Sequence, residues 1–267
     1  MPFLDEVVRE IRRELAEPSY GAGMAPRSSF TAPSLRGAIE RDRAAGALVV
    51  EYKRVSPGQP DPLLPPRTIT EFLETTRLGP VTAYSCLATP PRFNGNPKDV
   101  AELARSTHRP VLFKDIVISR RQVEVAARTG ASAILLIARI ERDSRSVEPL
   151  SSLAEEAHRL GLEVVLEFHD RSELSRQADV SADVYGVNAR DLDTLSVDPT
   201  TAAETLREAR AAGLRPLLGL SGVEGPSDAH RFWDAGADGI LVGTAVARST
   251  HPAEFLSSLR RMPGGNP

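Results

Sequence analysis

The sequence has little cysteine, few large aromatic side chains and no strong excess of either charge. Cys86 is the single cysteine among 267 residues, which excludes an internal disulfide and a cysteine-rich zinc cluster. One tryptophan and four tyrosines are too few for a base-stacking platform, and a net charge of −3 with mixed signs predicts no binding to nucleic acid. Without an apolar run long enough to span a membrane, and without a signal peptide, we expect a soluble, cytoplasmic protein.

Lysine is also scarce, since only three of the 33 basic residues are lysines. Lys53 and Lys114 end the apolar runs ALVVEYK and RPVLFK, whereas Lys98 lies in the polar context of an expected helix start. An arginine keeps its charge under ordinary conditions, but a lysine moved out of water can shift its pKa and exchange a proton. Lys53 and Lys114 are therefore candidates for proton chemistry.

Eight short apolar runs recur along the chain and alternate with amphipathic stretches at 97–107, 119–129, 146–160 and 199–212. Alternation of strands and helices predicts a parallel sheet, and eight units fit an α/β fold of the closed (β/α)8 TIM barrel type. An open doubly wound sheet is the alternative, but its glycine-rich turn is absent after the first strand, where EYKRVSPG follows. The predicted strands are 47–52, 80–85, 110–114, 132–137, 162–167, 183–187, 215–220 and 238–242.

The chain divides into three predicted parts. Residues 1–46 form an N-terminal helical extension that packs on the barrel, residues 47–262 form the (β/α)8 barrel, and residues 263–267 are a tail. The proline-rich segment 56–66 follows the first strand. Loops of this length are often lids or binding loops, although a plain surface connector explains the segment equally well.

Polar residues follow most of the predicted strands, at the barrel face where chemistry gathers in this fold. Lys114 and Glu167 form the expected acid/base pair, because Glu167 is an unusual residue for an apolar strand unless it has a partner or a function. The alternative is a structural ion pair, either Lys53–Glu51 or Lys114–Glu167. The candidate residues at the strand ends are Glu51, Lys53, Ser56, Lys114, Glu167, Asn188, Arg190, Ser221, Gly222, Gly243 and Thr244.

The last two strand ends, LSGV (220–223) and VGTA (242–245), place glycines and hydroxyls where backbone N–H groups can face a phosphate, although simple tight turns explain them as well. Strand four ends in the apolar residues 135–137. The five histidines are scattered, so we expect no metal site, and we interpret His169 as a cap or surface residue.

Several motifs, in order along nearly the whole chain, resemble those of the indole-3-glycerol phosphate synthase family of tryptophan biosynthesis. The resemblance implies a (β/α)8 barrel that acts as a carbon–carbon lyase without a cofactor. Its substrate would be a phosphorylated small molecule, 1-(2-carboxyphenylamino)-1-deoxyribulose 5-phosphate, and its products indole-3-glycerol phosphate, CO₂ and water. The motifs are EYKRVSP (51–57), RFNG (92–95), VLFKD (111–115), LEFHD (166–170), GVNARDL (186–192), LSGV (220–223) and ILVGTA (240–245).

The resemblance also implies roles for individual residues. Lys114 would protonate the substrate carbonyl, Glu167 would be the acid/base of the dehydration, and Lys53 would reach the phosphate. Glu51 and Asn188 would hold substrate hydroxyls and the proton network. Binding residues would be Ser56 and Arg190 near the carboxylate, Ser221, Gly222, Gly243 and Thr244 at the phosphate, and Pro57, Phe93, Leu135 and Leu195 around the ring.

The chain departs from the family pattern at a few positions: Leu220 replaces a glutamate, Ile116 an aromatic residue, and Ala88-Thr89 a Thr-Glu pair. Two other functions remain open. One is a Schiff-base aldolase with Lys114 or Lys53 as nucleophile, and the other is a catalytically weakened barrel that binds phosphate. We expect a monomer or weak homodimer.

Overall fold

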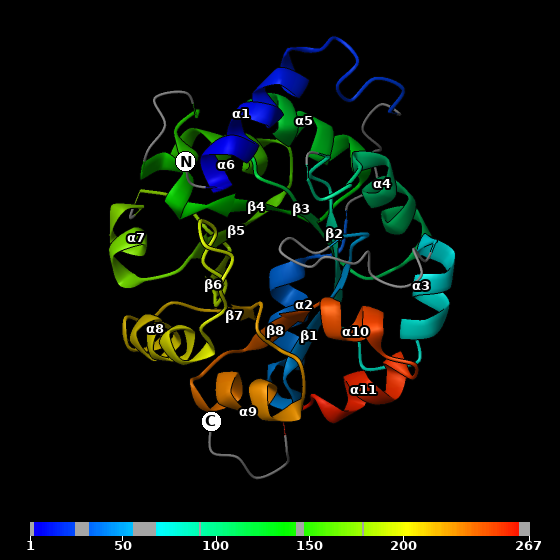
Figure 1. The fold of residues 1–267 in the computed structure, drawn as a ribbon, viewed down its shortest axis with the longest axis vertical. Coiled ribbons are helices and arrows are strands. Elements are labelled where there is room, and N and C mark those ends of the chain that lie inside the picture. Colours follow the sequence, from blue (N-terminus) through cyan, green and yellow to red (C-terminus); the bar gives the residue numbers. More distant parts are fainter. Residues whose placement is uncertain are drawn as a thin grey trace.

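A computed structural model describes residues 3–24, 32–55, 68–90, 92–142, 147–177 and 179–261. Its centre is a closed barrel of parallel strands in the order β1 to β8, with β8 paired to β1, which confirms the predicted fold class. Figure 1 shows the strands in the middle of the molecule and the helices around them. The strands are β1 (Ala47–Tyr52), β2 (Ala83–Leu87), β3 (Val111–Lys114), β4 (Ala133–Ile137), β5 (Glu163–Phe168), β6 (Val184–Asn188), β7 (Leu217–Leu220) and β8 (Gly239–Val242).

Helices follow the strands in turn, as the amphipathic stretches predict. No helix in the described ranges is long and apolar enough to cross a membrane. Segment 56–66 and the tail 263–267 lie outside the described residues, so both remain predictions. The helices are α1 (Phe3–Ala16), α2 (Leu35–Asp42), η1 (Arg43–Ala45), α3 (Ile69–Thr76), α4 (Pro97–Ser106), α5 (Arg120–Thr129), η2 (Ala138–Arg142), α6 (Leu150–Arg159), α7 (Arg171–Arg176), α8 (Pro199–Ala211), α9 (Pro226–Asp234), α10 (Thr244–Arg248) and α11 (Pro252–Ser258).

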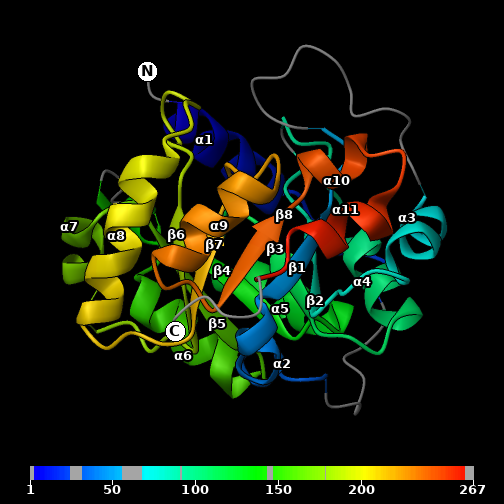
Figure 2. The ribbon, with the colours of Figure 1, turned by 90° about the horizontal axis from the view of Figure 1, so that it is seen from below.

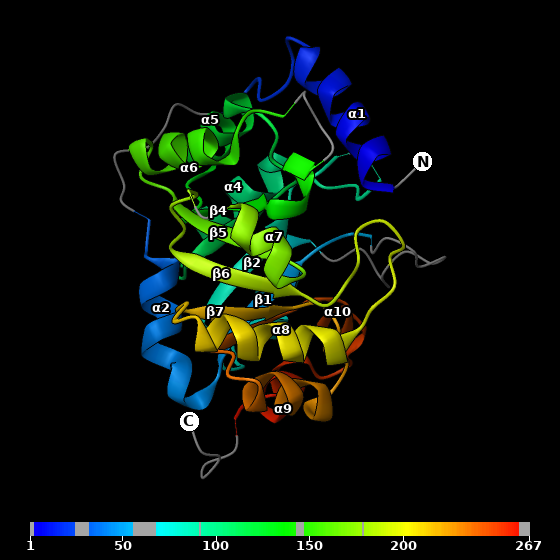
Figure 3. The same cartoon turned by 90° about the vertical axis from the view of Figure 1, so that its left-hand side faces the viewer.

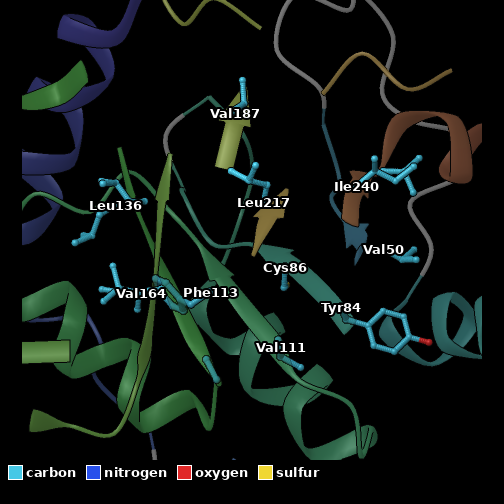
Figure 4. Packing of buried hydrophobic residues seen from close by; sticks show 14 of the residues in the cluster. Val50, Tyr84, Cys86, Val111, Phe113, Leu136, Val164, Val187, Leu217 and Ile240 are labelled. Atoms are coloured by element: carbon cyan, nitrogen blue, oxygen red, sulfur yellow. The ribbon is translucent and has the colours of Figure 1, made fainter. Parts of the chain in front are cut away.

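The strands are buried on both faces, which explains why their sequences are nearly continuous apolar runs. Along each strand, every second residue points outward and packs under the helices, and these residues belong to the larger core cluster. Figure 4 shows some of them as sticks, including Val50, Phe113 and Leu136. Residues of the other parity, such as Leu112, Leu135 and Val165, fill the interior of the barrel in a second cluster. The barrel is therefore a packed core whose polar residues are displaced to its rim.

Two helices of the N-terminal segment lie at different ends of the barrel, on opposite sides of the strands in Figures 2 and 3. Helix α2 packs on β1 and β2, and its N-cap Ser34 donates a hydrogen bond to Glu163, the first residue of β5. Helix α1 lies at the other end, where Arg92 in the loop after β2 forms ion pairs of 2.9 Å with both Glu6 and Glu10. Helix α2 therefore covers the barrel end at which the strands begin, and α1 borders the end at which they finish.

A buried carboxylate connects the last turns of the barrel. Asp238, 4% exposed, precedes β8 and accepts hydrogen bonds from both terminal nitrogens of Arg210 in α8, at 3.0 and 3.2 Å. It also accepts a 2.9 Å hydrogen bond from the backbone N–H of Leu217 at the start of β7. One side chain thus fixes α8, β7 and β8 relative to each other.

We expect Asp238→Ala to lower the free energy of unfolding by about 3 kcal/mol, because it leaves a partly buried guanidinium and a buried N–H without their partner. Denaturant unfolding followed by circular dichroism measures the change. The control is Asp234→Ala at the exposed end of α9, for which we expect a change within about 0.5 kcal/mol. Equal stability of the two variants would contradict the role assigned to Asp238.

Candidate active site

A pocket of about 340 Å³ opens at the carboxyl ends of the strands. It is the place where loop residues from distant parts of the chain converge in this fold. Most of the candidate residues, which were chosen individually from the strand ends and from the resemblance, line this pocket. They are Glu51, Lys53, Phe93, Lys114, Asn188, Arg190, Leu195, Ser221, Gly222, Gly243 and Thr244.

Glu51 is the central charge of the pocket. Its side chain is 4% exposed and lies between two lysines, with Oε1 2.9 Å from Nζ of Lys53 and Oε2 3.5 Å from Nζ of Lys114. Burial by itself would raise the pKa of Glu51, but the two ammonium groups outweigh it and lower that pKa to about 2. The carboxylate is therefore ionised at any physiological pH.

Lys114 lies at the end of β3 with its Nζ facing into the pocket region. Burial favours the neutral amine, but the charges of Glu51 and Glu167 outweigh it and raise the pKa of Lys114 above its ordinary value. Lys114 is consequently an ammonium group at neutral pH. Of the two structural ion pairs considered from the sequence, Lys53–Glu51 is present, and Lys114 pairs with Glu51 as well.

Glu167 is 1% exposed on β5 and is not among the residues that line the pocket. Its Oε1 accepts a 2.9 Å hydrogen bond from Nδ2 of Asn188, which ends the neighbouring strand β6 and lines the pocket. Its Oε2 is buried and has no hydrogen-bond partner among the described residues. A buried oxygen without a partner is costly, so this atom has room for one further hydrogen bond.

The phosphate candidates lie where β7 and β8 end. Ser221 and Gly222 both adopt positive φ, at 63° and 73°, so the chain turns sharply after β7. Gly243 directly contacts the central pair, because a Cβ at this position would lie 2.7 Å from Oε1 of Glu51 and 3.2 Å from Cε of Lys53. A side chain at position 243 would therefore displace the carboxylate.

The pocket also has apolar lining residues. They include Phe93 in the loop after β2, Leu87, Leu192 and Leu195. Phe3 of α1 also lines the pocket and packs edge-on against Phe93, with ring centroids 6.1 Å apart. Sequence reasoning missed Phe3, since its only signal was its place on the apolar face of an amphipathic helix.

The other residues that the sequence analysis singled out are not all part of the pocket. Leu135 is 2% exposed in the barrel interior and is not among the residues that line the pocket. Leu220 does line the pocket, and Ile116 belongs to the interior cluster. Ser56 and Pro57 lie outside the described residues. Cys86 is fully buried, and burial raises the pKa of its thiol, which suits a packing role.

His169 differs from the surface residue expected from the sequence. Its ring is 11% exposed and contacts Glu173 of α7 and the carbonyl oxygen of Arg190.

Among the described residues, no group of three or more His, Cys, Asp or Glu side chains is placed to hold a metal ion.

Comparisons with known proteins point to one family. The sequence profile described as indole-3-glycerol phosphate synthase matches residues 4–259. Similar proteins with this name occur in Exiguobacterium sibiricum (32% identical, 97% of each chain covered) and in a Nocardioides species (33%, 99% of each). The Aeropyrum pernix protein of the same name is 37% identical over 86% of this chain and 87% of its own.

A solved structure agrees with the fold alone. The thiamine phosphate pyrophosphorylase from Pyrococcus furiosus superposes with a TM-score of 0.55 at 20% identity, over 82% of this chain and 95% of that one.

We expect Lys53→Met to raise the pKa of Glu51 from about 2 toward 4.5, because one of the two ammonium groups that lower it is removed. The depressed pKa of Glu51 stabilises the fold above pH 4.5, and this contribution is lost as the pH falls from 4.5 toward 2. A carbon-13 titration of the glutamate carboxyls measures the shift. The control, Lys98→Met at an exposed lysine, leaves the pKa of Glu51 unchanged; an equally low pKa in Lys53→Met would contradict the assignment.

Proposed function

This chain belongs to the indole-3-glycerol phosphate synthase family, and from that premise we propose how its pocket performs the reaction. The enzyme is a carbon–carbon lyase of tryptophan biosynthesis. It closes the ring of 1-(2-carboxyphenylamino)-1-deoxyribulose 5-phosphate, with loss of CO₂ and water. The electrons balance within the substrate, so proton transfer suffices, and we propose that the enzyme works without a cofactor, as a monomer or weak homodimer of the cytoplasm.

The polarity of the pocket supports one orientation of the substrate. The phosphate lies at Ser221-Gly222 and Gly243-Thr244, with the ammonium group of Lys53 beside Gly243. The anthranilate ring lies against the apolar wall that includes Phe93 and Leu195. A substrate with an anion at one end and an aromatic ring at the other matches a pocket divided in the same way. Ser56 and Pro57 are proposed to complete the wall beside the carboxylate.

Ring closure is the first step. The ring carbon that carries the carboxylate attacks the ketone carbon of the ribulose chain, and negative charge develops on the ketone oxygen. We assign the proton donor to Lys114, because its pKa is raised and it is loaded with a proton at neutral pH. The bond to the carboxylate then breaks, CO₂ leaves, and the electron pair restores the aromatic ring.

Dehydration is the second step. The new hydroxyl leaves as water after it receives a proton, and the neighbouring carbon loses one. We assign this exchange to Glu167, whose Oε2 is buried without a partner while Asn188 holds its Oε1. Asn188 also lines the pocket, so it can hold a substrate hydroxyl against this carboxylate. Overall one proton is consumed, because the carboxylate leaves as neutral CO₂.

Glu51 and Arg190 have supporting roles. Glu51 pairs with both lysines and holds them close together, and we assign to it a hydrogen bond accepted from a substrate hydroxyl. Arg190 lines the pocket and donates a 2.8 Å hydrogen bond to the carbonyl oxygen of Leu195. The planar guanidinium suits recognition of the substrate carboxylate until that group leaves.

The observation that carries the proposal is the contact of Lys114 with a buried carboxylate, since its Nζ lies 3.5 Å from Oε2 of Glu51 in the pocket. A Schiff-base aldolase needs a neutral amine as nucleophile, which is achieved by lowering the pKa of the lysine. Glu51 and Glu167 do the opposite here, and they favour a proton donor over a nucleophile. Incubation with the substrate while the fluorescence of the indole product is followed tests the function. Phosphate-ligand binding without turnover by folded protein would favour the weakened barrel, and trapping of an adduct by borohydride would favour the aldolase.

We expect Lys114→Arg to keep the charge and the fold but to lower kcat about 100-fold or more, because a guanidinium does not release a proton at working pH. Indole fluorescence gives the rate, and thermal unfolding verifies the fold. Lys98→Arg is the matched control, since Lys98 is exposed in α4, and its rate should equal that of the wild type. A near-normal rate in Lys114→Arg would remove this lysine from the proton-transfer step.

We expect Gly243→Ala to raise KM about tenfold, because the added methyl group displaces the Glu51 carboxylate and with it the ammonium group of Lys53. Steady-state kinetics and calorimetric titration with inorganic phosphate measure the effect. The control is Gly225→Ala before α9, where a Cβ meets no atom within 4 Å. If both variants bind phosphate as the wild type does, the anion does not lie at Gly243.

A further inference from the structure

The loop of residues 189–198 joins β6 to α8 and forms one wall of the pocket. Four of its residues line that wall: Arg190, Leu192, Leu195 and Val197. Two of them, Arg190 and Leu195, are proposed above to contact the substrate. The position of this loop therefore sets where substrate-binding groups lie.

The loop has its own internal hydrogen bonds. Arg190 and Val197 form an isolated antiparallel bridge, and Oδ1 of Asp191 accepts hydrogen bonds from the N–H groups of Asp193 and Thr194 at 2.9 and 2.8 Å. Leu195 adopts a positive φ of 61°, which a leucine rarely does. Such a conformation persists only where the surroundings hold it.

Arg139 holds the loop from outside the pocket. This side chain follows β4 in η2 and is 15% exposed. Its Nε lies 3.0 Å from Oε1 of Glu173 in α7, and its Nη1 lies 2.7 Å from Oδ2 of Asp191 in the loop. Oδ2 of Asp193, also in the loop, lies 3.6 Å from the same Nη1. The guanidinium therefore connects α7 to two carboxylates of the loop.

His169 holds the base of the same loop. Its Nδ1 is 3.1 Å from Oε2 of Glu173, and its Nε2 is 2.6 Å from the carbonyl oxygen of Arg190. Both partners are acceptors only, so both ring nitrogens can donate at once only in the imidazolium form. Thr205 of α8 fixes the backbone of His169 with a 3.2 Å hydrogen bond to its carbonyl oxygen.

We propose that Arg139, Glu173 and His169 are positioning residues that hold loop 189–198, and with it Arg190 and Leu195, in the geometry that binds the substrate. Glu173 is the shared partner, fully buried between the arginine and the histidine. The proposal adds no catalytic group. It rests on the proposed function where it concerns turnover, but the state of the histidine is measurable without any substrate.

The charged groups around His169 determine its protonation. Burial favours the neutral ring, but Glu173 on α7 and Glu167 on β5 outweigh it, and the pKa of His169 is raised above 6.5. Arg139 reaches His169 only through Glu173, and the loop offers a carbonyl oxygen instead of a charge. Both hydrogen bonds of the His169 ring are therefore present below pH 6.5, and one of the two is lost as the pH rises through the raised pKa of His169, while Arg139 keeps its contacts with the loop.

The first arm of the test is nitrogen-15 NMR of the histidine rings in the free protein across a pH titration. The signals of His169 are identified by their loss in His169→Gln. We expect His169 to carry both protons at neutral pH, with a pKa above 6.5 that falls in Glu173→Gln. A single-proton tautomer at neutral pH, or a pKa that does not respond to Glu173→Gln, would overturn the proposal.

The second arm is kinetic. We expect kcat/KM of the wild type to fall as the pH passes the pKa of His169, through a rise in KM with little change in kcat. The amide of His169→Gln can donate to Arg190 but cannot titrate, so this fall should vanish. Arg139→Met should raise KM about tenfold, and Arg139→Lys should restore part of the loss.

His158→Gln is the matched control, because His158 also pairs with a carboxylate, Asp183, at 2.8 Å, but outside the pocket. Its KM and pH profile should equal those of the wild type. An unchanged KM in both Arg139→Met and His169→Gln would overturn the positioning role. Absence of turnover in the wild type would instead refute the proposed function, and the NMR result would still decide the state of His169.

Discussion

A buried carboxylate with two ammonium partners determines the arrangement at the mouth of this barrel. Glu51 lies at the end of a strand that is buried along its whole length, and removing such a charge from water is costly unless it is paired. Lys53, just after β1, and Lys114, at the end of β3, supply the pairing. The Glu51 carboxylate is buried next to both lysine side chains, so the position of each of the three groups depends on the other two. The arrangement thus holds two lysine side chains against one buried carboxylate at the pocket.

The rest of the molecule makes that cluster possible. Below it the barrel interior is packed with aliphatic side chains and leaves no space for charged groups, which therefore lie at the rim. Above it three walls come from unrelated parts of the chain: α1 with Phe3, the loop after β2 with Phe93, and loop 189–198. Each wall is held by ion pairs on its outer side, such as Arg92 with Glu6 and Arg139 with Asp191. The pocket therefore combines a rigid charged floor with walls whose positions depend on surface and half-buried arginines.

The sequence predicts the fold and the floor of the pocket better than its walls. Strand β1 begins and ends where the apolar run does, because a buried parallel strand leaves a continuous signal. The predicted run 80–85 is shifted from β2 at 83–87, since Val81 is buried although the ladder to β1 begins at Ala83. Glu51, Lys53 and Lys114 are recognisable because a charge at the end of an apolar run is rare. The sequence around Phe3 and Arg139 has no comparable signal. Their roles depend on tertiary contacts with residues far away in the sequence.

The distribution of arginine and lysine follows from what each position requires. The partly buried structural pairs use arginine, whose planar group makes two hydrogen bonds with one carboxylate, as Arg54 does with Asp99 and Arg210 with Asp238. At the floor of the pocket a guanidinium would not release a proton, whereas an ammonium group close to two carboxylates can be protonated again after each transfer. Proton chemistry therefore favours lysine at position 114, in a chain that otherwise uses arginine almost everywhere.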